Sequence, residues 1–440
     1  MLEANVSIIT ELKKFVTLVG SQPDLLEHFK KSETSFIRHR KLPFERLVLL
    51  IAKLCKKTLS IELETFFEEI KIDSPCSVSA FTQQRNKLND SFFYCWNMVL
   101  WFNFYLHYGS KVKRWNGYRI IAADGSSVNL VNNPSLREYF GGQSNQHGAF
   151  VIGKIYYCYD VLNDLILFPR LSPWRISEME MAYDSIAYLE SDMLLIYDRN
   201  FSNYKMIALH QWQEKEIKFV IRAKDSLNVV KAFIKSGAAS TVIVLPPTKN
   251  AIAGLRKSGY IINQDTVLYV RLVRVELDKS TEILMTNLWE EDDYPASEFK
   301  NLYFKRWGIE TNISFQKNTM QLESFSGLTA TAVLQDFYAT VFMANLHSLL
   351  IKDAQQTVNN TMGHRKHPMK INKNKSLGQL KKKLILLFIE NEPEPILKLL
   401  HALFIKDTIP IRRGRSYPRT RRNLKSQSKY RTFTNFKPSF

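Results

Sequence analysis

Apolar residues recur at helical spacing through the first 110 residues of the chain. The pattern predicts helices at residues 45–57 and 61–70, because positions three and four apart share one face of a helix. Residues 91–110 carry no charged side chain and are long enough to span a bilayer. Two asparagines and a histidine interrupt this stretch, so we favour a buried helix of an all-α N-terminal domain over a membrane span.

A candidate DNA-reading unit lies at residues 61–88. Ser77 or Ser79 can cap a helix that reaches residue 88, and a short turn separates this helix from the preceding one. Arg85 and Lys87 on the second helix are therefore candidate DNA contacts of a helix-turn-helix. Two ordinary surface helices produce the same pattern, so both interpretations stay open.

The hydrophobic pattern changes to that of strands at residue 118. Three strands with an Asn-Asp turn precede a helix, a strand, a second helix and a last strand, which is the order of an RNase H-like mixed α/β sheet. The expected strands are 118–124, 150–161, 165–171, 193–197 and 218–222, and the expected helices are 177–190 and 202–212.

Strand patterns continue after residue 222 with little helix, which indicates a β-rich insertion with strands at 240–245, 266–277 and 282–288. Helical patterns return from residue 295 onward. The domains expected are residues 1–112 (helical, DNA-binding), 113–222 (first part of the RNase H-like catalytic core), 223–294 (β-rich insertion), 295–354 (second part of the core) and 355–440 (basic helical C-terminal region and tail).

Positive charge is concentrated near the C-terminus. The chain has 61 Lys and Arg against 42 Asp and Glu, a formal net charge of +19. Residues 364–383 hold eight basic residues and residues 412–440 hold ten, with no acidic residue in either segment. Removing these 18 leaves 43 basic residues against 42 acidic ones. The excess favours a polyanion such as DNA, contacted by Arg412, Arg413 and Arg415, although a basic tail can also serve solubility alone.

The four cysteines fit neither a zinc pair nor a dense disulfide framework, since they lie 21, 19 and 63 residues apart. The first ten residues do not have the basic and apolar segments of a secretory signal. These features predict a cytoplasmic, nucleoid-associated protein without membrane contact.

Three carboxylates are candidates for chemistry. Asp124 and Asp198 each follow an apolar run, so we expect both to end a strand and project from the sheet edge. Glu310 lies in the helix after the insertion. Carboxylate oxygens suit Mg²⁺ or Mn²⁺, and three of them can hold two ions about 4 Å apart for phosphoryl transfer if Asp124 bridges the ions.

The helix that carries Glu310 has further polar residues on the same face. Tyr303, Arg306, Glu310 and Lys317 fall within about 60° at about 100° per residue and extend over about 21 Å. A solvated helix face is the usual explanation of a charged stripe. Here the stripe combines a carboxylate with three groups able to contact phosphate, downstream of two aspartates, and this predicts a catalytic site.

On these residues the chain resembles the DDE transposases of insertion-sequence family four. The Y-R-E-K element that runs from Tyr303 to Lys317 is the most specific part of the resemblance. The D-G-S motif at Asp124 and the D-R-N-F motif at Asp198 are similar to the first and second acidic motifs of that family. The resemblance extends over about residues 115–327.

The resemblance implies cut-and-paste DNA transposition, with hydrolysis at the element ends, a hairpin on the excised DNA in some members, and strand transfer into target DNA. It implies two Mg²⁺ or Mn²⁺ ions at the three carboxylates and phosphate contacts by Tyr303, Arg306 and Lys317. Trp307 either stacks on a flipped base or packs against the insertion, and Trp289 is a guess for the second stacking aromatic.

The partners implied are the terminal inverted repeats and the target DNA, both double-stranded and held by a homodimer. A DNA-binding repressor without catalysis is the alternative, although all three carboxylates are present. An RNase H-like nuclease of repair or RNA processing is a third possibility, which the Y-R-E-K element disfavours.

Overall fold

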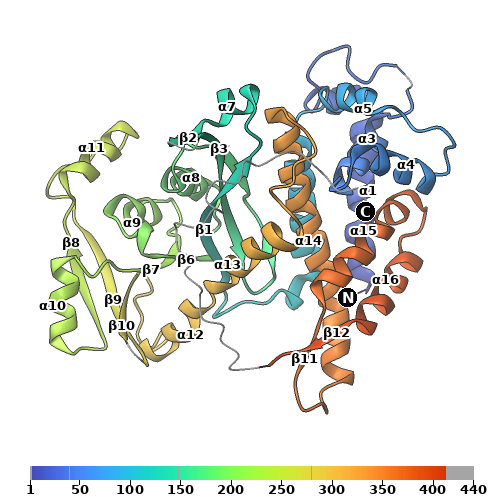
Figure 1. The fold of residues 1–440 in the computed structure, drawn as a ribbon. Helices are drawn as coiled ribbons and strands as arrows, with labels where there is room; N and C mark the ends of the chain where they lie inside the picture. Colours follow the sequence, from blue (N-terminus) through green and yellow to red (C-terminus); the bar gives the residue numbers. More distant parts are fainter. Residues whose placement is uncertain (1, 39, 146–147, 279, 413–440) are drawn as a thin grey trace.

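The computed structural model describes residues 2–38, 40–145, 148–278 and 280–412. A ten-stranded mixed sheet has the order β2-β3-β1-β6-β7-β10-β9-β8, and β4 and β5 also pair with β3. Helices lie on both faces of the sheet (Figure 1). The strands are β1 (Arg119–Leu130), β2 (Gly142–Asn145), β3 (Gly148–Asp160), β4 (Leu165–Ile166), β5 (Arg170–Pro173), β6 (Met193–Tyr197), β7 (Lys218–Arg222), β8 (Ser240–Leu245), β9 (Leu268–Leu277) and β10 (Ser280–Thr286).

The first half of this sheet confirms the expected RNase H-like arrangement. Strand β1 is antiparallel to β3 and parallel to β6, and β6 is parallel to β7. Every residue of β6 is buried, as is typical of a parallel strand covered on both faces. The covering helices are α7 (Pro134–Phe140), α8 (Glu178–Ser185) and α9 (Tyr204–Gln211) from this part of the chain, and α12 (Phe299–Phe304), α13 (Trp307–Ser314) and α14 (Ala330–Thr361) from beyond the insertion.

Residues 223–294 extend the same sheet, because β10 pairs with β7 and then with β9, which pairs with β8. The segment also contains two helices that the sequence analysis did not expect, α10 (Asn228–Ser236) and α11 (Lys249–Lys257). Both are only nine residues long and bury one or two apolar residues each. Figure 1 shows this segment at the end of the sheet remote from the N-terminal helices.

The N-terminal and C-terminal helices pack together around α14. Helix α6 contains residues 91–108 and is buried as expected: Trp96 stacks on Phe342 of α14 with ring centroids 3.9 Å apart. In the part of the chain that the structure describes, no helix is long and apolar enough to cross a membrane. The N-terminal helices are α1 (Leu2–Ser21), α2 (Pro23–Glu27), α3 (Phe44–Ala52), α4 (Leu59–Glu69), α5 (Val78–Arg85) and α6 (Ser91–Tyr108).

The C-terminal region contains α15 (Lys373–Ile389), α16 (Glu394–Lys406) and a small β11–β12 ribbon (Met369–Ile371 with Thr408–Pro410). Much of the first basic segment is therefore helical. Arg412 is exposed at the end of the described chain. Arg413 and Arg415 lie outside the described residues.

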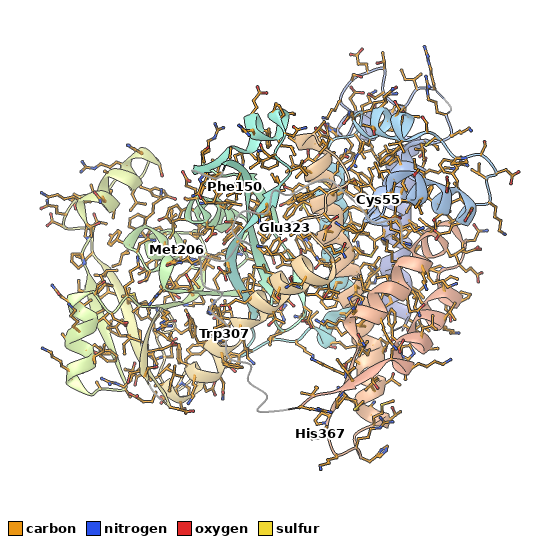
Figure 2. The ribbon with its side chains drawn as sticks, viewed as in Figure 1. Cys55, Phe150, Met206, Trp307, Glu323 and His367 are labelled. Carbon is orange, nitrogen blue, oxygen red and sulfur yellow. The ribbon has the colours of Figure 1, made fainter. Side chains whose placement is uncertain are left out.

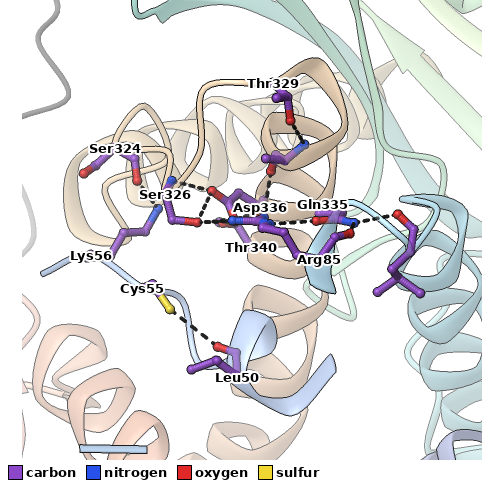
Figure 3. A network of polar contacts seen from close by, with 12 residues as sticks. Leu50, Cys55, Lys56, Arg85, Ser324, Ser326, Thr329, Gln335, Asp336 and Thr340 are labelled. Atoms are coloured by element: carbon purple, nitrogen blue, oxygen red, sulfur yellow. Dashed lines mark hydrogen bonds and ion pairs between the residues drawn. The ribbon is translucent and has the colours of Figure 1, made fainter. Parts of the chain in front are cut away.

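Arg85 does not lie on a DNA-reading surface, so that prediction is wrong. Its side chain is 1% exposed and points from α5 into α14 (Figure 3). Its guanidinium donates to Asp336 Oδ1 at 2.9 Å, to Gln335 Oε1 at 2.9 Å and to Ser326 Oγ at 2.7 Å. Burial alone would raise the pKa of Asp336, but Arg85 and the other donors hold it below its ordinary value. Arg85 thus joins the N-terminal helices to α14.

Lys87 lies beyond the end of α5, because the helix that Ser77 caps stops at Arg85 instead of reaching residue 88. Its ammonium group bonds Gln84 Oε1 at 3.1 Å, and the side chain lines a cavity of about 550 Å³ together with Arg40 and Lys41. Lys87 therefore stays a candidate contact.

We expect Arg85→Ala to lower the free energy of unfolding by ~3–5 kcal/mol, because the change leaves the Asp336 carboxylate buried without its cation. Urea denaturation measures the loss. Lys87→Ala is the matched control on the same segment, with an expected change within ~0.5 kcal/mol. A loss below ~1 kcal/mol for Arg85→Ala would contradict the role of this ion pair.

Candidate active site

Parallel pairing of β1 with β6 brings Asp124 and Asp198 to adjacent positions. The register ends with Ala123 beside Tyr197, so the next residue on each strand is the aspartate. Asp198 follows β6 as expected, and its Oδ1 accepts the Asn200 N–H at 2.8 Å. Asp124 does not end its strand, because β1 stays paired to β3 as far as Leu130.

Both aspartates face α12 and α13. Side chains alternate along a strand, so Asp124 shares a face with Ile120, and Asp198 continues the face of Ile196. Ile120 and Ile196 belong to one buried cluster with Phe299 and other residues of α12. The two carboxylates therefore lie on the side of the sheet that carries Glu310.

The helix after the insertion is not continuous as expected. Helix α12 ends at Phe304, α13 begins at Trp307, and residues 315–319 form a π-helical turn. Lys305 and Arg306 between the helices keep right-handed helical dihedrals, so the chain keeps its direction. Turns of this π-helical kind are common at functional sites.

Arg306 connects the carboxylates of this site. Its guanidinium donates to Glu310 Oε1 at 2.8 Å and lies 3.9 Å from Asp124 Oδ2. It is also 4.9 Å from the ring centroid of Trp307 and 5.8 Å from that of Tyr303. Its Nε is buried and has no hydrogen-bond partner among the described residues.

Lys317 and Tyr303 flank the carboxylates. The Lys317 ammonium group donates to Ser126 Oγ at 2.8 Å and to the Ser127 carbonyl, two and three residues after Asp124. Burial lowers the pKa of Lys317. Tyr303 is 8% exposed, and burial raises its pKa to about 12. The described structure thus brings the Y-R-E-K residues to the aspartates, and both Lys317 and Arg306 contact β1.

Trp307 is accessible. Its side chain is 44% exposed at the junction of α12 and α13, where Figure 2 labels it. The Arg306 guanidinium lies against its ring, so the exposed indole and the cation are neighbours. Trp289 is partly buried after β10, and no contact tests its suggested role.

Asp124 is in an environment that disfavours its charged form. Burial raises its pKa from 3.8 to about 6, and the Asp198 and Glu178 carboxylates add to the rise. The Gly125 N–H, which donates to Asp124 Oδ1 at 2.8 Å, and Arg306 act in the opposite direction. Excess negative charge therefore accumulates where β1 and β6 separate.

The sequence analysis did not identify Glu178 as a residue of the site. It is the first residue of α8, which Ser177 caps, and its side chain crosses β1 at Gly125. A Cβ built on Gly125 would lie 2.5 Å from Glu178 Cγ, so only glycine fits there. A glycine inside a strand often marks such a close approach, and this was the available signal.

The donor set suits a divalent cation, because carboxylate oxygens are the preferred ligands of Mg²⁺ and Mn²⁺. The raised pKa of Asp124, which burial causes first and the Asp198 carboxylate adds to, shows that its charged form would gain from a nearby cation. The side chains do not stand in a finished metal site: among residues 2–412 as described, no three His, Cys, Asp or Glu are arranged to hold an ion. The cation between Asp124 and Glu310 is Arg306.

The family model of the transposase DDE domain matches residues 115–346, more than half of the chain. The chain belongs to the DDE transposase family. The matched segment of this DDE transposase begins just before β1 and ends within α14, so it includes Asp124, Asp198 and Glu310.

Two individual proteins are similar to this DDE transposase. The Escherichia coli (strain K12) protein named "Putative transposase InsZ" is 24% identical over 101 residues, which are 22% of this chain and 34% of that one. The match thus spans about a third of that curated relative. A cryo-EM structure of the piggyBac transposase synaptic complex with hairpin DNA is 12% identical, with a TM-score of 0.38 over 98% of this chain and 88% of that one.

We expect Asp124→Asn to stabilise the protein at about pH 7.5 by ~1–3 kcal/mol. The pKa of Asp124 is higher in the folded state than in the unfolded chain, so stability falls as pH rises from about 4 to 6, and asparagine avoids this loss. Urea denaturation at about pH 7.5 and about pH 5 measures the effect, which is smaller at the lower pH.

Asp184→Asn is the control, because Asp184 is an exposed partner of Arg170 and should change stability by less than ~0.5 kcal/mol. Equal stability of Asp124→Asn and the wild type at both pH values would show that the charged Asp124 carboxylate does not destabilise the folded protein.

Proposed function

We propose that the chain is a metal-dependent DNA transposase of insertion-sequence family four, which cuts element ends by hydrolysis and transfers them into target DNA. One observation carries the proposal: the β1–β6 register sets Asp124 beside Asp198 on the face that Glu310 covers. The Y-R-E-K residues around this point support the narrower family assignment.

Asp124, Asp198 and Glu310 would hold two Mg²⁺ or Mn²⁺ ions. When bound, such ions supply Lewis acidity and a nucleophilic water or 3′-hydroxyl for phosphoryl transfer. The protein's own residues position the DNA. Arg306 and Lys317 offer cations beside the carboxylates, and Tyr303 lines the same face.

Arg306 has two roles in this proposal. Without DNA it neutralises Glu310 and Asp124, and with DNA it turns to a phosphate of the cleaved end. A guanidinium suits both roles, because its donors match carboxylate and phosphate equally well. Its buried, unpaired Nε indicates that the contacts in the DNA-free arrangement are incomplete. The exposed Trp307 next to it would stack on a flipped base.

Further DNA contacts are assigned to Lys87, Arg412 and the basic residues that follow it. The proposed substrates are the terminal inverted repeats and the target duplex, held by two copies of the chain. The basic residues are a sequence-independent source of affinity, since phosphate contacts carry no sequence information.

We expect Asp124→Asn and Glu310→Gln each to reduce Mg²⁺-dependent nicking of DNA that contains an element end by at least about a thousandfold, while DNA binding persists. Nicking is measured on labelled DNA and binding by mobility shift. Asp184→Asn is the control that should retain activity, because Asp184 of α8 is exposed and pairs with Arg170.

A wild-type protein that binds DNA but never nicks it, with either Mg²⁺ or Mn²⁺, would favour the repressor over the enzyme. Nicking without joining to target DNA would instead favour a nuclease.

We expect Arg306→Gln to bind Mn²⁺ about tenfold more tightly or better in the absence of DNA, because the competing cation is gone. Electron paramagnetic resonance of free Mn²⁺ at about pH 8 measures this affinity. Arg170→Gln removes an exposed arginine elsewhere on the sheet and should not change it. Weaker Mn²⁺ binding by Arg306→Gln would contradict the competition.

A further inference from the structure

A cleft of about 830 Å³ lies outside the site described above, between α14, the end of α6 and the β11 strand. None of its lining residues belongs to the Y-R-E-K element or to the three carboxylates. The charged residues in its wall are five lysines and two aspartates, Lys111, Lys113, Lys352, Lys370, Lys373, Asp164 and Asp353.

The lysines come from three separate parts of the chain. Lys370 and Lys373 belong to the basic segment 364–383, whereas Lys111 and Lys113 follow α6 and Lys352 lies in α14. None of the five forms an ion pair with another described residue, although most arginines of the sheet do. Tertiary structure therefore collects five lysines here against two aspartates, which leaves positive charge in excess.

Lys352 shows that the excess charge is built into the wall. Its ammonium group donates to the Asn163 carbonyl at 2.7 Å and lies 4.6 Å from the ring centroid of Phe104. Burial lowers its pKa to about 8. Asn163 also holds Lys113, through hydrogen bonds of 3.0 Å with both the N–H and the carbonyl of that residue.

The turn between β3 and β4 lies against both the cleft and α13. The turn between β3 and β4 contributes Asp164 to the cleft. Val161 in the same turn backs the catalytic helix, since a Cβ on Gly308 would lie 3.4 Å from Val161 Cγ1. Gly308 directly follows the exposed Trp307, so a duplex that leaves the active site past Trp307 is close to the cleft.

We propose that this cleft binds the sugar-phosphate backbone of duplex DNA beside the active site, independently of base sequence. The inference rests on the proposed function for the identity of the polyanion. Besides lysines, the wall offers the exposed amides of Gln356, Asn359 and Asn360 on α14. From Lys352 to Asn359 the helix rises about 11 Å, a length over which duplex DNA carries about six phosphates.

Phosphate contact explains these residue types better than base readout does. Lysines and amides donate to phosphate oxygens in many orientations, whereas single-stranded bases need aromatic platforms. Tyr108 is the one aromatic residue in the described wall, and it is 3% exposed.

The test compares the wild type with Lys111→Gln/Lys113→Gln/Lys370→Gln, which leaves the partly buried Lys352 in place. Fluorescence anisotropy gives the affinity for a duplex of unrelated sequence over a range of KCl concentrations, with EDTA present. Three lost contacts should make the slope of log K against log salt shallower by about 2–3 and weaken binding at physiological salt roughly 10- to 100-fold.

Lys14→Gln/Lys57→Gln/Lys398→Gln is the matched control, because it removes three exposed lysines elsewhere and the same total charge. Its slope should stay within about 0.5 of the wild-type slope. Thermal unfolding shows whether the triple variant folds. If it does not, Lys370→Gln alone replaces it in the test and should make the slope shallower by about 1.

A wild-type slope for the triple variant would overturn the proposal. An unchanged DNA slope together with a loss of polyglutamate binding would also overturn it, because the cleft would then bind an acidic protein. Failure of the proposed function would give a different result, in which the wild type itself does not nick end-containing DNA. The anisotropy measurement with EDTA does not depend on nicking.

Discussion

Parallel pairing of β1 with β6 places Asp124 beside Asp198 at the point where the two strands separate. The Asp124 and Asp198 carboxylates repel each other, and Glu178 of α8 adds a third negative charge. The repulsion is tolerated because β6 is buried along its whole length between β1 and β7, and because Arg306 supplies a nearby cation. The same excess of negative charge makes the location suitable for divalent ions.

Stability and function therefore oppose each other at this point of the fold. Active sites commonly hold groups in arrangements that the fold alone would not favour, and the rest of the structure compensates. Here the compensation comes from apolar packing of α12 onto the sheet, in a cluster that includes Ile120, Ile196 and Phe299. Gly125 contributes by leaving room for the Glu178 side chain, at a position where any other residue would clash.

Basic residues occupy two kinds of surroundings, the protein interior and an open cleft. Arg85 is used entirely inside the protein, where it ties α5 to α14 through Asp336. The cleft lysines, by contrast, form no ion pair with a described residue, although the Asp164 and Asp160 carboxylates act on Lys352 from a greater distance. The net charge of +19 does not distinguish these two kinds of residue, since a buried arginine and a cleft lysine count equally in it. Only the surroundings of each residue separate the two uses.

Much of the fold was predictable because its signals are local. The strands at 193–197, 218–222 and 240–245 begin and end as expected, since each is an apolar run bounded by polar residues. The buried helix at 91–108 followed from its lack of charge. Helices α10 and α11 were missed, although the apolar residues of each lie on one helix face, because each is only nine residues long and lies between strands.

The candidate site was predictable in its residue types and less so in its geometry. Helical spacing placed Tyr303, Arg306, Glu310 and Lys317 on one face, and the structure brings them to the aspartates despite the break at residue 305. Glu178 was not recognisable, since only the approach of α8 to β1 at Gly125 gives it a role.

The sequence by itself determined the RNase H-like sheet and the candidate residues for chemistry, because strand periodicity and helical spacing are properties of neighbours along the chain. Only the tertiary structure decided that Arg85 faces inward, that Arg306 spans two carboxylates, and that lysines from three segments line one cleft. Each of these depends on residues far apart in sequence, and electrostatic interactions depend on distance in space and on burial, which no local pattern records.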